Sequence, residues 1–217
     1  HLSLKVERIV TGPFQENSYI AWQDGLPSCL VIDPGDDPGL IIEVILGNDL
    51  SPIAVVNTHA HLDHIGGVSG LKEKYGIPFY LHPNEKPILD GYERDCAFFG
   101  ITPKITPTVD HWLSAGELKV SDFLIQCVET PGHTPGGTCL VINEHVFTGD
   151  TIFAGSVGRT DLPGGNWDTL CDSLVKAMEN ISHDCILHPG HGPDTTLEKE
   201  IKQNPFLIPL LKRVNSF

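Results

Sequence analysis

The chain is short of positive charge. Of its 217 residues, 14 are Lys or Arg and 28 are Asp or Glu, which gives a formal net charge of −14. No basic run is longer than Lys212-Arg213. Proteins that hold phosphate backbones without sequence preference need clustered cations. We therefore expect no nucleic-acid partner.

Long hydrophobic runs are also lacking. A membrane-spanning helix needs about 18 or more consecutive apolar residues, whereas the longest run here, Leu40–Leu46, is interrupted by Glu43. No secretory signal with an apolar central region opens the chain. The sequence therefore predicts no membrane partner and a cytoplasmic location.

Paired cysteines are missing too. The six cysteines include no Cys-x-x-Cys pair, and several lie within apolar stretches such as Leu124–Val128. In a chain of this length we expect buried thiols rather than a disulfide framework or a cysteine-ligated metal. Free thiols are typical of a reducing compartment.

Short strand-like and helix-like segments alternate along the chain. Asp37-Pro38 is typical of a helix start, and Thr195 with Glu198 has the spacing of a capping box. A helix is expected to begin near Gly66. The apolar stripe from Trp167 to Met178 follows one face of an amphipathic helix. The expected strands are Leu4–Val10, Ser18–Trp22, Cys29–Ile32, Ile53–Val56, Phe79–Leu81, Leu124–Val128, Thr138–Ile142, His145–Phe147 and Cys185–Leu187, with helices over Gly39–Leu46 and up to Tyr75.

This alternation predicts a layered α/β architecture. The chain divides loosely near residues 105–110 into two similar halves. No flexible linker marks the division, so residues 1–217 are predicted to form a single domain.

Histidine is abundant and clustered. The β-branched run Ile53–Val56 leads directly into His59-Ala60-His61-Leu62-Asp63-His64. Four potential ligands at the end of a buried strand need polar partners, and a metal ion supplies them. In an extended stretch His59, His61 and Asp63 share one side, and they cannot all reach one ion if the chain turns after His61. Two adjacent ions resolve this, one held by His59 and His61 and the other by Asp63 and His64.

Three later loops offer further ligands of the same kinds. Tight Gly- and Pro-rich turns present His133 and His191 after predicted strands. Asp150 follows another short strand, and its two carboxylate oxygens suit a bridge between two cations. The donor set therefore has five imidazoles and two carboxylates without a thiolate, which favours two Zn²⁺, with iron or manganese as alternatives. His1, at the start of the chain, is left out of this set.

Other residues carry weaker signals. Asp33 is either an orienting partner for a ligand imidazole or a turn-forming residue. His188 is either such a partner or simply buried, and Arg159 is expected to pair with Asp161 in the loop after Asp150. The remaining histidines are assigned no role: His82, His111, His145 and His183.

The His-x-His-x-Asp-His run, with the later Pro-Gly-His-Thr, Gly-Asp and Gly-His segments, resembles the metallo-β-lactamase fold superfamily. The chain looks most like its compact glyoxalase II-like hydrolases. The resemblance extends over nearly the whole sequence, including Val31–Gly35, Gly155–Asp161 and Asn204–Phe206. It implies an αββα sandwich with a dinuclear metal site.

The same resemblance implies a ligand assignment and a reaction. One metal would be held by His59, His61 and His133, the other by Asp63, His64 and His191, with Asp150 bridging the two. A metal-bound hydroxide would attack an acyl thioester such as S-D-lactoylglutathione or a related ester. The carboxylates with catalytic roles would be Asp63, which orients the water or takes a proton, and Asp150.

Three alternatives stay open at this point. The first is an iron-dependent persulfide dioxygenase, which resembles the chain in Gly158–Asp161 but differs at Gly190-His191-Gly192. The second is a lactonase or β-lactamase, and the third a non-catalytic or RNA-processing relative. About 25 residues follow His191, so the helical region that holds glutathione in full-length glyoxalase II is expected to be largely absent. The oligomeric state is left open.

Overall fold

The computed structural model describes residues 2–215, so His1 lies outside the described residues. The chain forms two compact units, the first ending at Leu113 and the second beginning at Ser114. That boundary lies just beyond the predicted range of 105–110. The single-domain organisation stays a prediction, and each unit is described by itself.

The first unit has a six-stranded mixed sheet in the order β1-β2-β3-β4-β5-β6. Strands β1 to β3 pair antiparallel, whereas β3 to β6 are parallel neighbours. The elements are β1 Leu4–Thr11, β2 Glu16–Gln23, β3 Ser28–Ile32, α1 Pro38–Gly47, β4 Ser51–Val56, α2 Leu62–Ile65, α3 Val68–Tyr75, β5 Phe79–Leu81, the 3₁₀ turn η1 Pro83–Glu85, α4 Lys86–Asp90, α5 Tyr92–Phe98 and β6 His111–Trp112.

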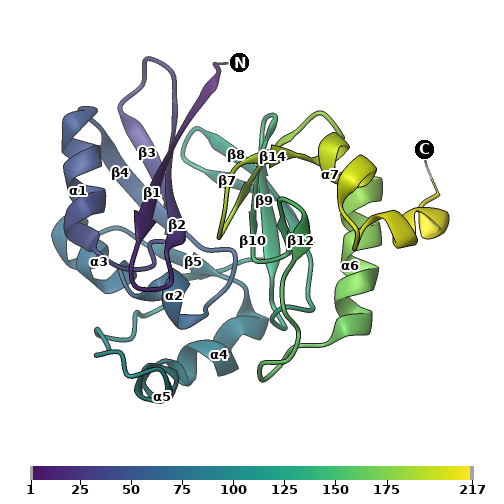
Figure 1. Ribbon diagram of the computed structural model, residues 1–217. Coiled ribbons are helices and arrows are strands. Elements are labelled where there is room, and N and C mark those ends of the chain that lie inside the picture. Colours follow the sequence, from purple (N-terminus) through teal and green to yellow (C-terminus); the bar gives the residue numbers. More distant parts are fainter. Residues whose placement is uncertain (1, 216–217) are drawn as a thin grey trace. The chain divides into compact units, whose positions relative to one another are not determined.

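Helices α1 and α3 cover one face of this sheet (Figure 1). Alternate strand residues such as Val31 and Val55, which are paired in register, share a core with Ile41 and Ile45 of α1 and with Leu71 of α3. The strands contribute every second residue to this core, and the helices contribute the residues of one face, which recur about every 3.6 positions. Because the central strands β3 and β4 are buried almost throughout, their carboxyl ends are held firmly in place.

The second unit also has a six-stranded sheet, in the order β14-β13-β10-β9-β8-β7, with a separate hairpin of β11 and β12. Only β10 and β13 pair in parallel. The elements are β7 Gly116–Val120, β8 Phe123–Glu129, β9 Thr138–Ile142, β10 His145–Gly149, β11 Ile152–Phe153, β12 Ser156–Val157, α6 Trp167–Asn180, β13 Ile186–Pro189, β14 Thr195–Thr196, α7 Leu197–Gln203 and the 3₁₀ segment η2 Ile208–Arg213.

The predicted amphipathic stripe is the buried face of α6. Leu170, Leu174 and Met178 pack in one core with Val146 of β10 and Leu187 of β13. Figure 1 shows α6 beside the sheet of this unit. The parallel pair β10 and β13 is joined through α6, as parallel neighbours require a long crossover connection. All the predicted strands and helices are present, within a few residues at their ends.

Three helix starts differ in detail from what was predicted. Asp37 is the N-cap residue before Pro38 of α1, as predicted, but its side chain makes no cap because its Oδ2 accepts a hydrogen bond from the Gly12 amide instead. The closing helix is capped by Thr196, whose hydroxyl accepts from the Lys199 amide, and not by Thr195. The helix expected near Gly66 is two helices, α2 and α3, that meet at Gly66 and Gly67.

All six cysteines are buried free thiols, as predicted. Burial raises the pKa of Cys29 to about 12 and that of Cys139 to about 11. These thiols therefore stay protonated and unreactive at neutral pH. In the described residues, no helix is both long enough and apolar enough to cross a membrane.

Candidate metal centre

In the first unit, the candidate ligands lie where β4 ends. The strand runs to Val56, and the chain then turns at His61 into the short helix α2. Extended backbone thus ends at His61, so Asp63 and His64 are presented by a helix rather than by alternation along a strand. His59 and His61 each offer a ligand atom within 4.8 Å of the other, and so do Asp63 and His64. These are the two pairs predicted from the spacing.

Asp33 lies beside this motif because β3 and β4 are parallel neighbours whose carboxyl ends share one edge of the sheet. Its carboxylate accepts hydrogen bonds from the Thr58 amide (2.7 Å) and the Thr58 hydroxyl (2.6 Å). It also faces Nδ1 of His64 at 3.0 Å. Of the two roles predicted for Asp33, an orienting partner of an imidazole or a turn-forming residue, these contacts support the first.

These contacts determine which ring nitrogen each histidine presents. His64 donates from Nδ1 to Asp33, which leaves the lone pair on Nε2. The Thr58 hydroxyl has given its hydrogen to Asp33, so it accepts from Nδ1 of His59 at 3.0 Å. Both imidazoles thus carry their lone pairs on Nε2, which is then the nitrogen that can bind a metal. Asp33 also lies within 4.8 Å of both histidines, but its hydrogen bonds mark it as a positioning group.

Glu16 is a neighbour that the sequence did not reveal. Its carboxylate is almost fully buried, accepts from the hydroxyls of Thr11 and Ser18, and lies 3.4 Å from Nδ1 of His64. Burial, opposed by His64 and reinforced by Asp33, raises the pKa of the Glu16 carboxyl well above its ordinary value. Two acidic side chains therefore approach one nitrogen of His64.

Two further residues brace the backbone of the motif. Asn57 donates to the carbonyls of His59 (3.3 Å) and His64 (2.8 Å). Glu85, fully buried, accepts from the amide of Ala60 at 2.8 Å. Neither residue was singled out in the sequence, although Asn57 opens the motif and Glu85 lies only three residues after His82.

In the second unit, Asp150, His133 and His191 follow β10, β8 and β13, which all run in the same direction. Their carboxyl ends consequently fall at one edge of the sheet. The Oδ2 atom of Asp150 lies 3.4 Å from Nε2 of His133 and 3.6 Å from Nε2 of His191. One largely buried carboxylate oxygen thus faces two imidazole nitrogens.

His133 is held by the loop after Asp150. Its Nδ1 donates to the backbone carbonyl of Arg159 at 2.7 Å, which again leaves the lone pair on Nε2. Gly158 allows this close approach, because a Cβ there would collide with the Asp150 carbonyl and meet Nδ1 of His133 at 3.1 Å. The Arg159 side chain forms the predicted ion pair with Asp161, at 2.6 and 2.9 Å on the exposed face.

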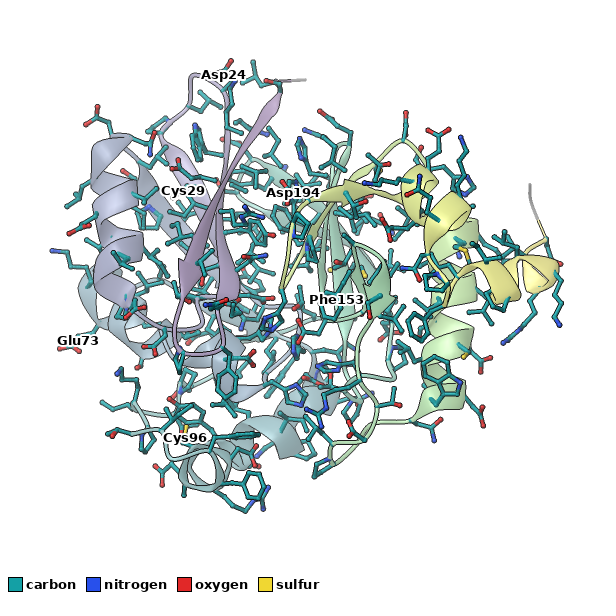
Figure 2. All side chains as sticks on the ribbon, viewed as in Figure 1. Asp24, Cys29, Glu73, Cys96, Phe153 and Asp194 are labelled. Carbon is teal, nitrogen blue, oxygen red and sulfur yellow. The ribbon has the colours of Figure 1, made fainter. Side chains whose placement is uncertain are left out.

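His188 belongs to a different arrangement. Its Nδ1 lies 3.1 Å from the carboxylate of Asp194, a residue that is labelled in Figure 2. Its Nε2 lies 2.9 Å from Nδ1 of His145. The two rings are stacked at 13°. His188 and Asp194 therefore close the loop that carries His191. His145, which was assigned no role, is the partner that completes this contact.

The other histidines have local roles. His82 accepts from the Asn84 amide, His183 contacts the Met178 carbonyl, and His111 packs against Tyr80.

Comparison with known proteins gives a consistent assignment. Residues 11–194 match the model of the metallo-β-lactamase superfamily. A probable metallo-hydrolase of Bacillus subtilis, YqgX, is 38% identical over 209 residues, covering 94% of this chain and 98% of that protein. The hydroxyacylglutathione hydrolase GloC of Haemophilus influenzae is 34% identical, covering 94% and 98%.

Solved structures agree with these relatives. The B3 metallo-β-lactamase BLEG-1 superposes with a TM-score of 0.85 at 34% identity, covering 94% of this chain and 99% of that one. TTHA1623, solved in a di-iron-bound form, gives 0.84 at 36% identity, covering 93% and 100%. The predicted fold class is confirmed.

Proposed function

Because the chain belongs to the metallo-β-lactamase superfamily of metal-dependent hydrolases, we propose that it hydrolyses small acyl thioesters with the aid of two divalent cations. S-D-lactoylglutathione is the reference substrate. The finer part of this proposal, the thioester, draws on the sequence motifs and on the 34% identical relative named as a hydroxyacylglutathione hydrolase.

The observation that carries the proposal is the surroundings of Asp150. A largely buried carboxylate oxygen lies 3.4 Å from Nε2 of His133 and 3.6 Å from Nε2 of His191. The hydrogen bond from Nδ1 of His133 to the Arg159 carbonyl makes Nε2 the ligand atom of that imidazole. In the first unit, His59 and His64 are likewise oriented to offer Nε2. A set of oriented imidazoles with a carboxylate, and without a thiolate, has the chemistry of a zinc or iron site.

We propose that His59, His61 and His133 hold one cation and that Asp63, His64 and His191 hold the second. Asp150 then contributes to both. Zn²⁺ is the first choice for this donor set. Iron is the alternative, since a solved relative 36% identical to this chain is described in a di-iron form.

Two bound cations would lower the pKa of a water molecule to about 7 and polarise the carbonyl of the substrate. The chain's own groups do the rest. Asp33 holds His64 and, through Thr58, His59 in the tautomer that offers Nε2. Asp63 is the carboxylate proposed to accept the proton released by water. No Ser or Cys nucleophile is needed for this reaction.

A β-lactamase is the second candidate, because BLEG-1, 34% identical to this chain, is described as a B3 metallo-β-lactamase. Both reactions break an acyl bond with the same nucleophile, so substrate comparison decides between them. Small-molecule substrates without nucleic-acid or membrane partners, and a cytoplasmic location, remain part of the proposal. They are supported by the net charge of −14 and by the six free thiols.

The test combines metal analysis with a substrate panel. Protein purified without chelator should contain about two transition-metal ions per chain, and His64→Ala should retain about one. His111→Ala, on the exposed strand β6, is the matched control and should retain both. S-D-lactoylglutathione, a lactone, a cephalosporin and glutathione persulfide are then assayed with zinc- and iron-loaded protein. Oxygen uptake with the persulfide, or turnover of the cephalosporin alone, would refute the thioesterase proposal.

A further inference from the structure

A small pocket in the first unit has Asp63 among its lining residues. Its walls come from the β1–β2 turn, from α2 and α5, and from the segment after α5, and its space is about 360 Å³ including the open mouth. Cys96, labelled in Figure 2, lies on the α5 side. Because this volume includes open solvent, the enclosed space is smaller and suits only a small group. The apolar residues that line it are Pro13, Phe14, Leu62, Tyr92, Cys96 and Ile101.

The ionic groups of the pocket do not favour an anionic ligand. Asp63 and Asp36 are both part of the lining. The single cation, Lys104, lies 3.9 Å from Asp36, which offsets its charge. A carboxylate entering this pocket would meet two acidic side chains and one cation that already has a partner. An uncharged group meets no such penalty.

Phe14 lines the pocket and contacts a second aromatic ring. It is 37% exposed, and it packs edge to face with Phe99, with 5.4 Å between ring centroids at 88°. This contact favours one orientation of the partly exposed Phe14 ring. Phe98, 82% exposed, does not line the pocket. An exposed, oriented ring beside a candidate catalytic carboxylate has the form of a substrate contact.

We infer that this pocket binds an uncharged apolar group of the thioester, with Phe14 and Ile101 as specificity-determining residues. The inference rests on the proposed function and narrows its substrate class. Since Asp63, a proposed metal ligand, is part of the lining, a group bound there would lie near the reacting carbonyl. The apolar group belongs to either the acyl or the thiol half of the substrate, and the experiment separates these two sources.

The test measures kcat/KM for matched substrates. In the acyl series, S-mandeloyl-, S-lactoyl- and S-succinylglutathione share one thiol. In the thiol series, lactoyl thioesters of 2-phenylethanethiol and N-acetylcysteamine share one acyl group and have similar leaving groups. The wild type should prefer the phenyl substrate in one series by roughly tenfold, the discrimination expected of an apolar pocket. The succinyl ester should be the poorest of the acyl series.

Phe14→Ala should remove most of that preference, because kcat/KM should fall further for the phenyl substrate than for the smaller lactoyl substrate. Phe98→Ala makes the same change outside the pocket and should preserve the preference. Thermal unfolding and metal content establish that both variants are folded and loaded. Equal losses on all substrates, an identical effect of Phe98→Ala, or no apolar preference in the wild type would overturn the inference.

A binding measurement distinguishes failure of the inference from failure of the proposed function. Thioether analogues in which CH₂ replaces the carbonyl bind without turnover, so calorimetry compares S-(2-hydroxy-2-phenylethyl)glutathione with S-(2-hydroxypropyl)glutathione. An analogous thioether pair represents the thiol series. Phenyl preference that depends on Phe14, without hydrolysis of any thioester, would retain the pocket and reject the thioesterase. Thioester hydrolysis without a phenyl preference, either in turnover or in binding, would retain the thioesterase and reject the pocket.

Discussion

One carboxylate, Asp33, sets the tautomer of two histidines. It accepts hydrogen bonds from Nδ1 of His64 and from the Thr58 hydroxyl. The hydroxyl oxygen of Thr58 in turn accepts a hydrogen bond from Nδ1 of His59. All three partners are buried. In such surroundings an imidazole with its hydrogen on the wrong nitrogen cannot bind a cation, however well its ring is placed.

Asp33→Asn should therefore lower metal affinity without removing any ligand. The new amide group would donate where the carboxylate accepted, and His64 would have to present Nδ1 as an acceptor and carry its hydrogen on Nε2. Losses of 10–100-fold in affinity are typical when such a partner is removed. Metal content after dialysis at fixed free zinc measures the change. Asp161→Asn, on the exposed ion pair with Arg159, is the control, and equal metal content in the two variants would contradict the argument.

At the same scale, the sequence predicts some residues and not others. His59, His61, Asp63 and His64 are recognisable because four ligand types fall within six positions. Glu16 and Glu85 are single acids among 28 Asp and Glu residues, and no spacing relates them to the motif. Their roles depend on burial and on polar contacts across 25 or more positions, which only the folded chain brings about.

At the scale of elements, strand direction gathers the candidate ligands. Asp33 and the motif follow the parallel neighbours β3 and β4, and Asp150 and His191 follow β10 and β13. Each unit has thus placed its polar groups at the carboxyl edge of its own sheet. The turns after the strands of both units need residues that allow sharp geometry, and Gly132, in the turn after β8, is one of them.

Gly132→Ala should disrupt the turn that presents His133. Gly132 has φ of 140°, and a Cβ there would collide with the backbone of Leu170 at the start of α6. Gly25 also has positive φ, 82°, but a Cβ there would meet nothing within 4 Å. Gly25→Ala thus measures the backbone strain alone, about 1 kcal/mol. The melting temperature should fall further in Gly132→Ala, with loss of bound metal, and similar values for both variants would refute the steric argument.

The elements that the sequence predicted are those with strong periodicity or long apolar runs, such as β3, β4 and α6. Strand β7 was missed because Glu117 and Lys119 point outward and leave few apolar residues to signal it. Helix α5 was missed because it buries only Tyr92 and Cys96 in seven residues. Short elements like these take their form from neighbours rather than from their own pattern.

At the scale of the whole molecule, bound cations would act on stability as well as on chemistry. The chain carries a net charge of −14, and two divalent ions would add +4 beside buried carboxylates. A ligand that binds only the folded state at 100 times its Kd stabilises that state by about 2.7 kcal/mol.

Chelation should accordingly lower the melting temperature by roughly 5–10 °C, since about 1 kcal/mol shifts a chain of this size by about 2–4 °C. Differential scanning fluorimetry with and without chelator measures this, and added Zn²⁺ should restore the original value. An unchanged melting temperature in protein verified to be metal-free would mean that the cations do not stabilise the fold.

The contact between His145 and His188 has room for a single hydrogen. Their facing nitrogens are 2.9 Å apart, so the two rings cannot both be imidazolium while the contact lasts. Glu144 and Asp194 flank the pair at 3.6 and 3.1 Å. Burial and the neighbouring His188 lower the pKa of His145 below its ordinary 6.5. The negative charges of Glu144 and Asp194 raise this pKa, but they offset the decrease only in part. The folded chain thus binds this proton more weakly than the unfolded chain does.

Acid should consequently weaken the contact between His145 and His188, which supports the loop that carries His191. The stability that depends on a neutral His145 is complete above the ordinary pKa of 6.5 and is lost as the pH falls through the lower folded value. In denaturant titrations between roughly pH 5 and 7, His145→Gln should lose less free energy of unfolding than the wild type, whereas His111→Gln should follow the wild type. If all three curves coincide, the pair carries no linked proton. If they diverge as expected, mild acid destabilises the protein through the histidine contact beside the loop that carries His191.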